Sequence, residues 1–156
     1  MNLKKVFNGC LVLLLVLVVS ACGSNGVNGV NGGIGKATEL DLKEVKAFMD
    51  DKKTGFLYVK SAFDSDSDKE SDRMQLSEIE RVAEAEKIDF YVFDAKELPT
   101  SELYEQDTSK RTLEQYSGTF AFYQEGEIKE KLDFTDISED DVSGEVEKFV
   151  QNMKHD

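Results

Sequence analysis

The sequence predicts an α/β fold, a three-layer sandwich on a mixed sheet, in which a parallel βαβ unit is followed by an antiparallel hairpin and a C-terminal helix. Two short, nearly all-apolar runs, 56–59 and 88–93, suit strands buried on both faces. The amphipathic stretch 72–87 separates them, and a strand, helix and strand at this spacing form a parallel pair with a right-handed crossover. The apolar-rich runs 119–123 and 128–134 then flank a turn sequence, which predicts the hairpin.

A first helix is predicted before these strands. Thr38 is a candidate N-cap, with Asp41 three residues further on. Four apolar residues then fall on one helical face: Leu42, Val45, Phe48 and Met49. The longer helix, 72–87, has its own inward face, formed by Leu76, Ile79, Val82 and Ala83. We therefore expect both helices to pack on the sheet.

The segment between the second strand and the hairpin contains one more predicted helix. It is short, covering 109–117, with Leu113 and Tyr116 directed inward and Gly118 ending it. In the hairpin turn that follows, Gly126 is expected to supply a positive φ angle.

The C-terminal helix closes the predicted domain. Ser138 is its candidate cap, with Asp141 at the third position. Five apolar residues recur after it at helical spacing and predict the face that docks on the sheet: Val142, Val146, Phe149, Val150 and Met153. We place the folded domain at 38–156.

The first 22 residues have the layout of an export signal. Lys4 and Lys5 precede an apolar run, 10–19, that is short of the ~20 residues a membrane-spanning helix needs. The run ends in Val19, Ser20, Ala21 and Cys22, and this end resembles the bacterial lipoprotein signal. The resemblance implies that residues 1–21 are a signal peptide and that Cys22, alkylated by lipid such as palmitate-bearing diacylglycerol, is the first residue of the mature chain. An ordinary secretory signal and an uncleaved membrane helix are the alternatives.

Residues 22–37 are predicted to be the lipidated Cys and a flexible tether. The tether is rich in Asn and Gly and has no periodic apolar face. It would hold the domain on the order of 20 Å from the lipid. The expected location is the extracytoplasmic face of the cell membrane, with the bilayer contacted through acylated Cys22.

Composition excludes several functions. The 32 acidic and 19 basic residues give a net charge of -13, so we expect no nucleic-acid partner, because phosphate binding needs a basic face. The two Cys are Cys10, in the signal, and Cys22, blocked by lipid, so the mature chain would have no free thiol. The single imidazole, His155, lies at the C-terminus without a nucleophile beside it. We therefore expect no enzyme and no cofactor.

The order of elements resembles that of a thioredoxin-like domain over residues 40–153. The strand 56–61 is similar to the one that delivers the active-site loop of thioredoxins, and residues 116–127 are similar to their hairpin region. Where that family has Cys-x-x-Cys, this chain has residues 63–72 without sulfur, and where it has a cis-Pro, this chain has Gly118. The resemblance implies the fold without its redox activity. The layout is also similar to bacteriocin transport accessory-type lipoproteins of Gram-positive bacteria.

An acidic segment stands where the dithiol would be. Asp64, Asp66, Asp68 and Asp72 occupy positions 1, 3, 5 and 9 of a calcium-loop pattern, but Lys69 and Gln75 replace its required Gly and Glu. Three interpretations remain open: a solvated loop, a weak divalent-cation site that binds calcium, and a loop that recognises a partner.

The sequence thus predicts a membrane-anchored, redox-inactive accessory module that binds another extracytoplasmic or membrane protein. Its expected partner-binding face comprises Phe63, Asp64, Gly118 and Thr119. The alternatives are a calcium-binding protein that uses the acidic loop, and a thiol-disulfide accessory protein whose partner supplies the thiols. An enzyme of unrecognised, non-thiol chemistry is a more distant hypothesis.

Overall fold

The structure, a computed structural model, describes residues 32–155. It consists of five strands and four α-helices, with 3₁₀ turns at Ala95–Glu97 and Thr108–Lys110. In chain order the elements are β1 (Ala37–Leu40), α2 (Leu42–Asp50), β2 (Gly55–Lys60), α3 (Asp66–Glu86), β3 (Phe90–Asp94), α4 (Thr100–Leu103), β4 (Thr119–Gln124), β5 (Glu127–Asp133) and α5 (Val142–His155).

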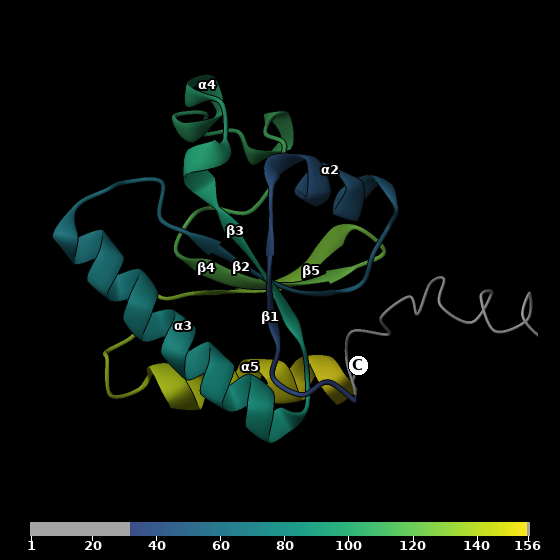
Figure 1. The fold of residues 1–156 in the computed structure, drawn as a ribbon, viewed down its shortest axis with the longest axis vertical. Helices are drawn as coiled ribbons and strands as arrows, with labels where there is room; N and C mark the ends of the chain where they lie inside the picture. The colour runs from purple at the N-terminus through teal and green to yellow at the C-terminus, as the bar shows by residue number, and fades with distance from the viewer. Residues whose placement is uncertain (1–31, 156) are drawn as a thin grey trace, which may run out of the picture.

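One mixed sheet in the order β1-β3-β2-β4-β5 forms the middle layer. β3 pairs in parallel with both β1 and β2, whereas β4 runs antiparallel to β2 and to β5. Helices α3 and α5 cover one face of the sheet, and α2 and the segment that carries α4 lie on the other side (Figure 1). The predicted fold class is confirmed, and the arrangement is that of a thioredoxin-like sandwich.

The central strand β2 divides the core into two layers. Its side chains alternate, so Phe56 and Tyr58 pack with α3 and α5, while Leu57 and Val59 pack with α2. Both faces are apolar because helices cover both, which explains the continuous run in the sequence. On the α3 and α5 side the ring centroids of Phe56 and Phe120 lie 5.5 Å apart. Burial of each such side chain stabilises the fold by about 1.5–3 kcal/mol.

The start of the domain differs from the prediction. Residues 37–40 form an edge strand parallel to β3, not the first turn of a helix capped by Thr38. The helix begins after Asp41, whose carboxylate accepts from the Glu44 backbone N–H at 2.7 Å while the Glu44 carboxylate accepts from the Asp41 N–H at 2.9 Å. This reciprocal capping box fixes the helix start three residues later than expected.

The chain just before β1 is bound to the loop that leads into β3. Asp89 Oδ1 accepts backbone hydrogen bonds from Ile34 at 2.9 Å and from Lys36 at 2.8 Å. Gly35 has a φ of +81°, and a Cβ there would lie 2.8 Å from the Cα of Glu84. Only glycine fits this backbone. The folded unit therefore includes residues that the sequence assigned to the tether 22–37.

Two further helix predictions need correction. The long helix begins at Asp66, six residues before the predicted start, because Ser65 caps it. The helix predicted at 109–117 is absent: a single 3₁₀ turn is followed by bends and turns up to β4. Leu113 is buried as expected, but Tyr116 is 42% exposed.

The hairpin and the C-terminal helix are confirmed. The turn between β4 and β5 has positive φ at Gly126, as predicted, and also at Glu125. All five residues predicted for the inward face of α5 are buried. The helix itself starts at Val142, four residues after Ser138, whose hydroxyl donates to Asp141 Oδ2 at 2.6 Å.

The predicted signal peptide, the predicted lipidation site Cys22 and most of the predicted tether lie outside the described residues. Within 32–155, no helix is both long enough and apolar enough to cross a bilayer.

Candidate functional site

The candidate site lies where β2 ends and α3 begins, the position that resembles the thioredoxin active-site corner. Residues 61–65 connect the two elements, and Ser117 and Gly118, in the loop before β4, line the same hollow as Ser61 and Phe63. Gly118 N donates to Val59 O at 2.7 Å, and Gly118 has a φ of +69°. A hollow of about 210 Å³ lies between the connection and the loop. It is lined by Ser61, Phe63, Asp68, Ser71, Asp72, Gln75, Ser117 and Gly118.

Asp72 ties the first turns of α3 to the end of β2. Its two carboxylate oxygens accept from the Ser61 N–H at 3.1 and 3.0 Å. The Tyr58 hydroxyl donates to Asp72 Oδ1 at 2.7 Å and lies 2.8 Å from Gln75 Oε1. Burial, together with the adjacent carboxylate, raises the pKa of Tyr58 above its ordinary value of 10. The Tyr58 phenol therefore stays protonated and donates to Asp72, and the Asp72 carboxylate holds the end of β2 against α3.

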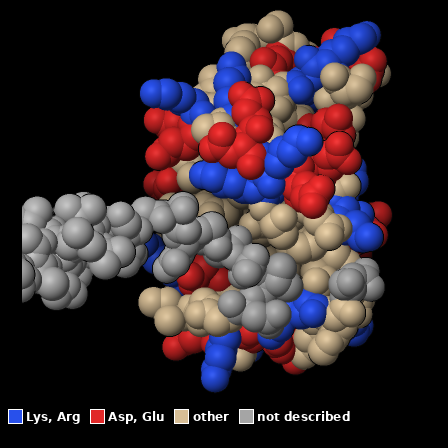
Figure 2. Space-filling view, turned by 90° about the vertical axis from the view of Figure 1, so that its right-hand side faces the viewer, with Lys and Arg blue, Asp and Glu red and all other residues tan. Residues whose placement is uncertain are grey.

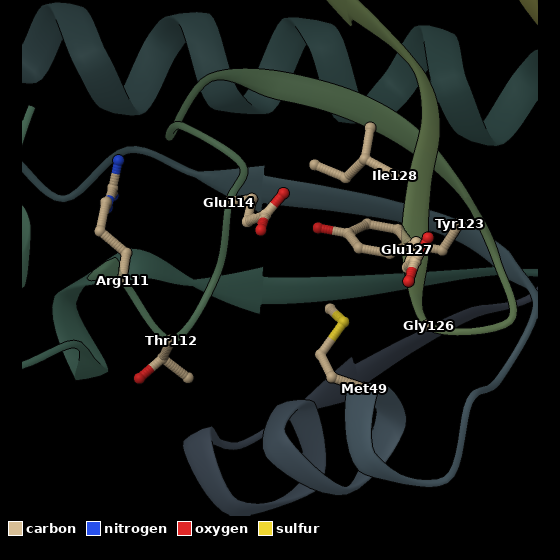
Figure 3. Close-up of a pocket in the computed structure, with 8 residues that line it drawn as sticks. All are labelled: Met49, Arg111, Thr112, Glu114, Tyr123, Gly126, Glu127 and Ile128. Atoms are coloured by element: carbon tan, nitrogen blue, oxygen red, sulfur yellow. The ribbon is translucent and has the colours of Figure 1, made fainter. Parts of the chain in front are cut away.

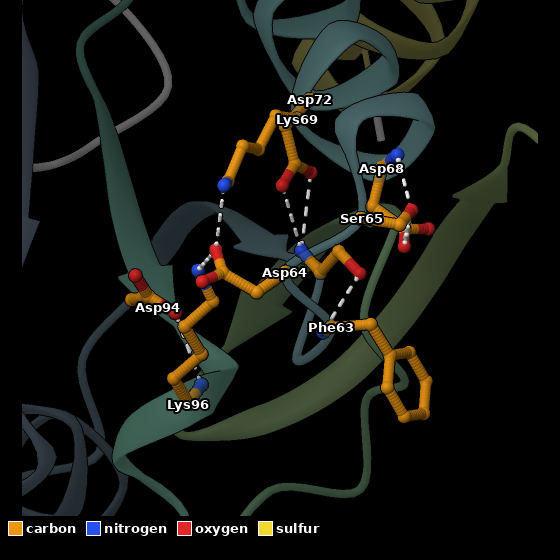
Figure 4. Close-up of polar contacts among 9 residues, drawn as sticks. Phe63, Asp64, Ser65, Asp68, Lys69, Asp72, Asp94 and Lys96 are labelled. Atoms are coloured by element: carbon orange, nitrogen blue, oxygen red, sulfur yellow. Dashed lines mark hydrogen bonds and ion pairs between the residues drawn. The ribbon is translucent and has the colours of Figure 1, made fainter.

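Asp64 is held between two ammonium groups. Its Oδ1 lies 2.8 Å from Lys96 Nζ and 3.1 Å from Lys69 Nζ (Figure 4). Hydrogen bonds from Lys96 and then Lys69 hold the pKa of this carboxyl below its usual range. All three groups are solvent-exposed, so the cluster positions the loop more than it stabilises the domain.

The acidic segment is helical and not a loop from Asp66 onward. The Ser65 hydroxyl accepts from the Asp68 N–H at 3.1 Å, and Asp66 and Asp68 lie in the first turn of α3. Negative side chains are favoured there because the unpaired N–H groups of a helix start carry positive potential. This favourable placement explains why the helix extends through a stretch that reads as solvated loop.

The four candidate calcium ligands do not converge. Asp64 pairs with lysines, Asp72 accepts from Ser61 and Tyr58, and Asp66 and Asp68 lie on a helix. Among the described residues, no group of three or more His, Cys, Asp or Glu side chains is arranged to hold a metal ion. The calcium hypothesis remains a prediction that this geometry does not favour.

The four residues of the expected partner-binding face have different surroundings. Phe63 is 55% exposed, and Figure 4 shows its ring directed away from the polar cluster around Asp64. Gly118 lines the hollow beside it. Thr119, by contrast, is 2% exposed and its hydroxyl donates to Tyr116 O at 2.7 Å. Its side chain is therefore part of the support beneath the surface.

Sequence reasoning missed the residues that hold this corner together. Tyr58 is hidden in an apolar run, and its partner Asp72 was read as a calcium ligand. Lys96 lies 32 residues from Asp64, yet it follows the end of β3, the strand next to β2. The carboxyl ends of adjacent parallel strands meet at one edge of a sheet, and this rule would have found the pair.

The corner has no sulfur and no imidazole. Cys10 and Cys22 both precede the described residues, and His155 ends α5. The groups present are carboxylates, hydroxyls, the side-chain amide of Gln75, backbone amides and one exposed aromatic ring. They suit the binding of a polar or peptide group and supply no nucleophile for thiol exchange.

Acidic and basic side chains interleave over the face drawn in Figure 2. The excess of negative charge is spread over this face and not gathered in one patch.

No protein-family model matches the chain, and no curated protein matches its sequence.

Proposed function

We propose that the chain is a membrane-anchored, redox-inactive thioredoxin-like lipoprotein that binds an extracytoplasmic protein partner through the corner between β2 and α3. The observation that carries the proposal is Phe63, an aromatic side chain left 55% exposed beside the hollow. Buried aromatic anchors contribute much of the binding energy of protein interfaces.

The polar groups around Phe63 are engaged within the domain. Asp72 holds Ser61 and Tyr58, and Asp64 holds Lys69 and Lys96. Such a constrained loop loses little conformational entropy when it binds, and pre-organisation of this kind raises affinity. Phe63 is then a ring on a fixed support, ready to enter a partner's pocket.

The chemistry of the corner supports binding over catalysis. A thioredoxin-like domain with Cys at this position exchanges disulfides, whereas residues 61–72 contain no Cys. The lipoprotein signal at Val19–Cys22 supports anchoring at a membrane, and no charge attraction is needed to hold so acidic a chain there.

Site-specific crosslinking in cells tests this proposal. A photoreactive phenylalanine analogue would replace Phe63 and, as the matched control, Tyr104, which is 70% exposed at the end of α4. We expect one dominant protein neighbour from position 63, absent from position 104. The same neighbours from both positions, or none from 63, would contradict binding at the corner.

The anchor is tested in the same experiment. A Cys22→Ala chain, which cannot be lipidated, should lose the neighbour captured from position 63 if the membrane position matters. Retention of that neighbour would leave corner binding in place and remove the anchor from the proposal. A Phe63→Ala chain should keep its melting temperature, because its ring is largely outside the core.

A further inference from the structure

A second hollow lies on the side of the sheet that α2 covers. Its volume is about 390 Å³, within the lower part of the range of roughly 300–1,000 Å³ typical of small-ligand pockets. Three segments enclose it: the end of α2, the β4–β5 hairpin and the chain at 111–114 (Figure 3). Its lining residues are Met49, Arg111, Thr112, Glu114, Tyr123, Gly126, Glu127 and Ile128.

Arg111 is the one basic residue of this lining, and it has no carboxylate partner among residues 32–155. The other two arginines of the chain, Arg73 and Arg81, are exposed, and each pairs with a glutamate three residues earlier in α3. Arg111 is half-buried, and its Nε is buried without a hydrogen-bond partner. A buried donor on a charged group destabilises a fold when no acceptor meets it. The guanidinium therefore has donor capacity that no described residue uses.

A second cation lies beside the same aromatic ring as Arg111. The Cζ of Arg111 lies 4.9 Å from the centroid of the Tyr116 ring, and Lys131 Nζ, from β5, lies 5.5 Å from it. The Tyr116 hydroxyl donates to Gln106 O at 2.9 Å, which holds the ring in place. Lys131 forms no ion pair with any residue in 32–155. Two positive charges therefore lie close to one ring at the edge of the hollow.

The acidic side chains nearby are engaged or exposed. Asp133 accepts from the Thr135 hydroxyl at 2.6 Å and from the Thr135 N–H at 2.9 Å, and these bonds lower the pKa of its carboxyl. Glu114 and Glu127 line the hollow, but both are exposed and neither pairs with the guanidinium. Water weakens the field of exposed carboxylates. They reduce the positive potential at the ring without cancelling it.

The other end of the hollow is apolar and fixed in place. Met49, Ile128 and the ring of Tyr123 supply its apolar surface. A Cβ at Gly126 would lie 2.6 Å from Met49 O, so the hairpin turn sits directly against the end of α2. Figure 3 shows Arg111 at one end of the hollow, away from Met49 and Ile128. An occupant would therefore contact a cation at one end and apolar side chains at the other.

We propose that this hollow binds a carboxylate carried on an apolar chain, with the carboxylate on the Arg111 guanidinium and the chain on Met49 and Ile128. The Nε–H and one Nη–H of a guanidinium donate in parallel to the two oxygens of a carboxylate. The bond to Nε forms as the guanidinium turns from the Tyr116 ring into the hollow, and Lys131 adds a second positive charge. The proposal is independent of the corner, because no residue lines both hollows.

The same groups disfavour other occupants. An ammonium group would meet the two cations beside Tyr116. A dianionic phosphate would meet about twice the repulsion from Glu114 and Asp133 that a carboxylate meets. A neutral apolar chain would leave the Arg111 Nε–H without an acceptor. A free apolar acid and a peptide with an apolar C-terminal residue both have the required chemistry.

NMR titration of the full chain in zwitterionic lipid nanodiscs tests the proposal. The chain has three arginines, so loss of one Nε–H signal in Arg111→Lys assigns that of Arg111. The probe is N-acetyl-leucine, and N-acetyl-leucinamide is its neutral counterpart. We expect a saturable shift of the Arg111 Nε–H signal with the acid and binding about tenfold weaker with the amide. No shift with the acid, or equal binding of acid and amide, would overturn the proposal.

Variants locate the site, with the methyl signals of Met49 and Ile128 as the readout. Arg111→Lys keeps the charge but loses the planar pair of donors, and it should bind the acid about tenfold more weakly. Arg81→Lys, on an exposed arginine of α3 outside the lining, should bind it as the unaltered chain does. Equal losses in these two variants would refute the site. Glu114→Gln removes a repelling charge and should bind the acid more tightly, and weaker binding would contradict an anion site.

Two further probes define the occupant. Binding of 4-methylpentanoate as tightly as N-acetyl-leucine supports a free acid, and weaker binding supports a peptide C-terminus. Inorganic phosphate should bind more weakly than either acid. Phosphate binding as tight as that of the acids would contradict selection of a carboxylate.

Discussion

Removal of one hydroxyl group tests the support of the corner. The Tyr58 side chain is fully buried, and its hydroxyl donates to a carboxylate at 2.7 Å. Tyr58→Phe deletes this donor and keeps the ring in the core. Asp72 retains the Ser61 N–H, so no carboxylate is stranded.

The expected cost follows from the charge of the acceptor. Hydrogen bonds to charged groups contribute about 1.5–3 kcal/mol, and those between neutral groups about 1 kcal/mol. Tyr123→Phe is the matched control, because the equally buried Tyr123 donates to the neutral Gln115 at 3.1 Å. We expect Tyr58→Phe to lower the free energy of unfolding by about 2 kcal/mol, near 8 °C in melting temperature, and Tyr123→Phe by about half as much.

Urea unfolding of the single variants and of a double-mutant cycle with Asp72→Asn measures these values. The cycle should give a coupling energy of about 1 kcal/mol between Tyr58 and Asp72. If Tyr58→Phe costs no more than Tyr123→Phe and the coupling is near zero, the carboxylate does not hold this corner and our account of its rigidity is wrong.

Three other perturbations have definite expected outcomes. Tyr58 and Tyr123 have folded-state pKa values above the ordinary 10. Their contribution to the free energy of unfolding is therefore fully present below pH 10 and is lost as the pH rises above it. Urea unfolding from pH 8 to 12 should show that the free energy of unfolding falls more steeply above pH 10 in the unaltered chain than in the variant with both tyrosines changed to Phe. The difference in slope should be about 1.4 kcal/mol per pH unit for each tyrosine. Gly35→Ala should destabilise the domain by about 2 kcal/mol or more, since its Cβ would meet α3 in a left-handed backbone. Gly144→Ala, with open space around it in α5, should instead stabilise the domain by about 0.5 kcal/mol. Equal shifts in melting temperature for the two variants would contradict the close packing of Gly35 against α3. Millimolar calcium and millimolar magnesium should give the same melting temperature, because Asp64 and Asp72 already have partners within the domain. A rise in melting temperature with calcium alone would support the calcium hypothesis.

Periodicity was sufficient for the elements that bury a full apolar face. β2, β3 and β4 were predicted because they are buried along almost their whole length, and α5 because one full face is buried. β5 is largely exposed and was predicted from the turn sequence that joins it to β4. β1 was missed because an edge strand of four residues, with Glu39 exposed, carries too little alternation to identify it. Thr38 lies in this strand and Asp41 directly follows it, and both residue types suit a helix start.

The site was predicted in place but not in detail. The order of elements located the corner, and Phe63 is exposed there. The alternating Asp and Ser residues read as a loop because local composition does not reveal that Ser65 caps a helix. The hollow lined by Met49, Glu114 and Tyr123 is formed by three segments that lie far apart in the chain. No local sequence pattern could therefore indicate it.

The hydrogen bonds from Ile34 and Lys36 to Asp89 fix the place where the chain enters the folded domain. The chain enters β1 near the C-terminal end of α5 (Figure 1). Because β1 and β2 both run parallel to β3, the start of β1 and the end of β2 lie at opposite edges of the sheet, and the corner lies at the end of β2. The six residues of β2 separate these two edges by roughly 20 Å. If Cys22 carries lipid as proposed, Phe63 lies at the edge of the sheet opposite the one where the anchored chain enters the domain.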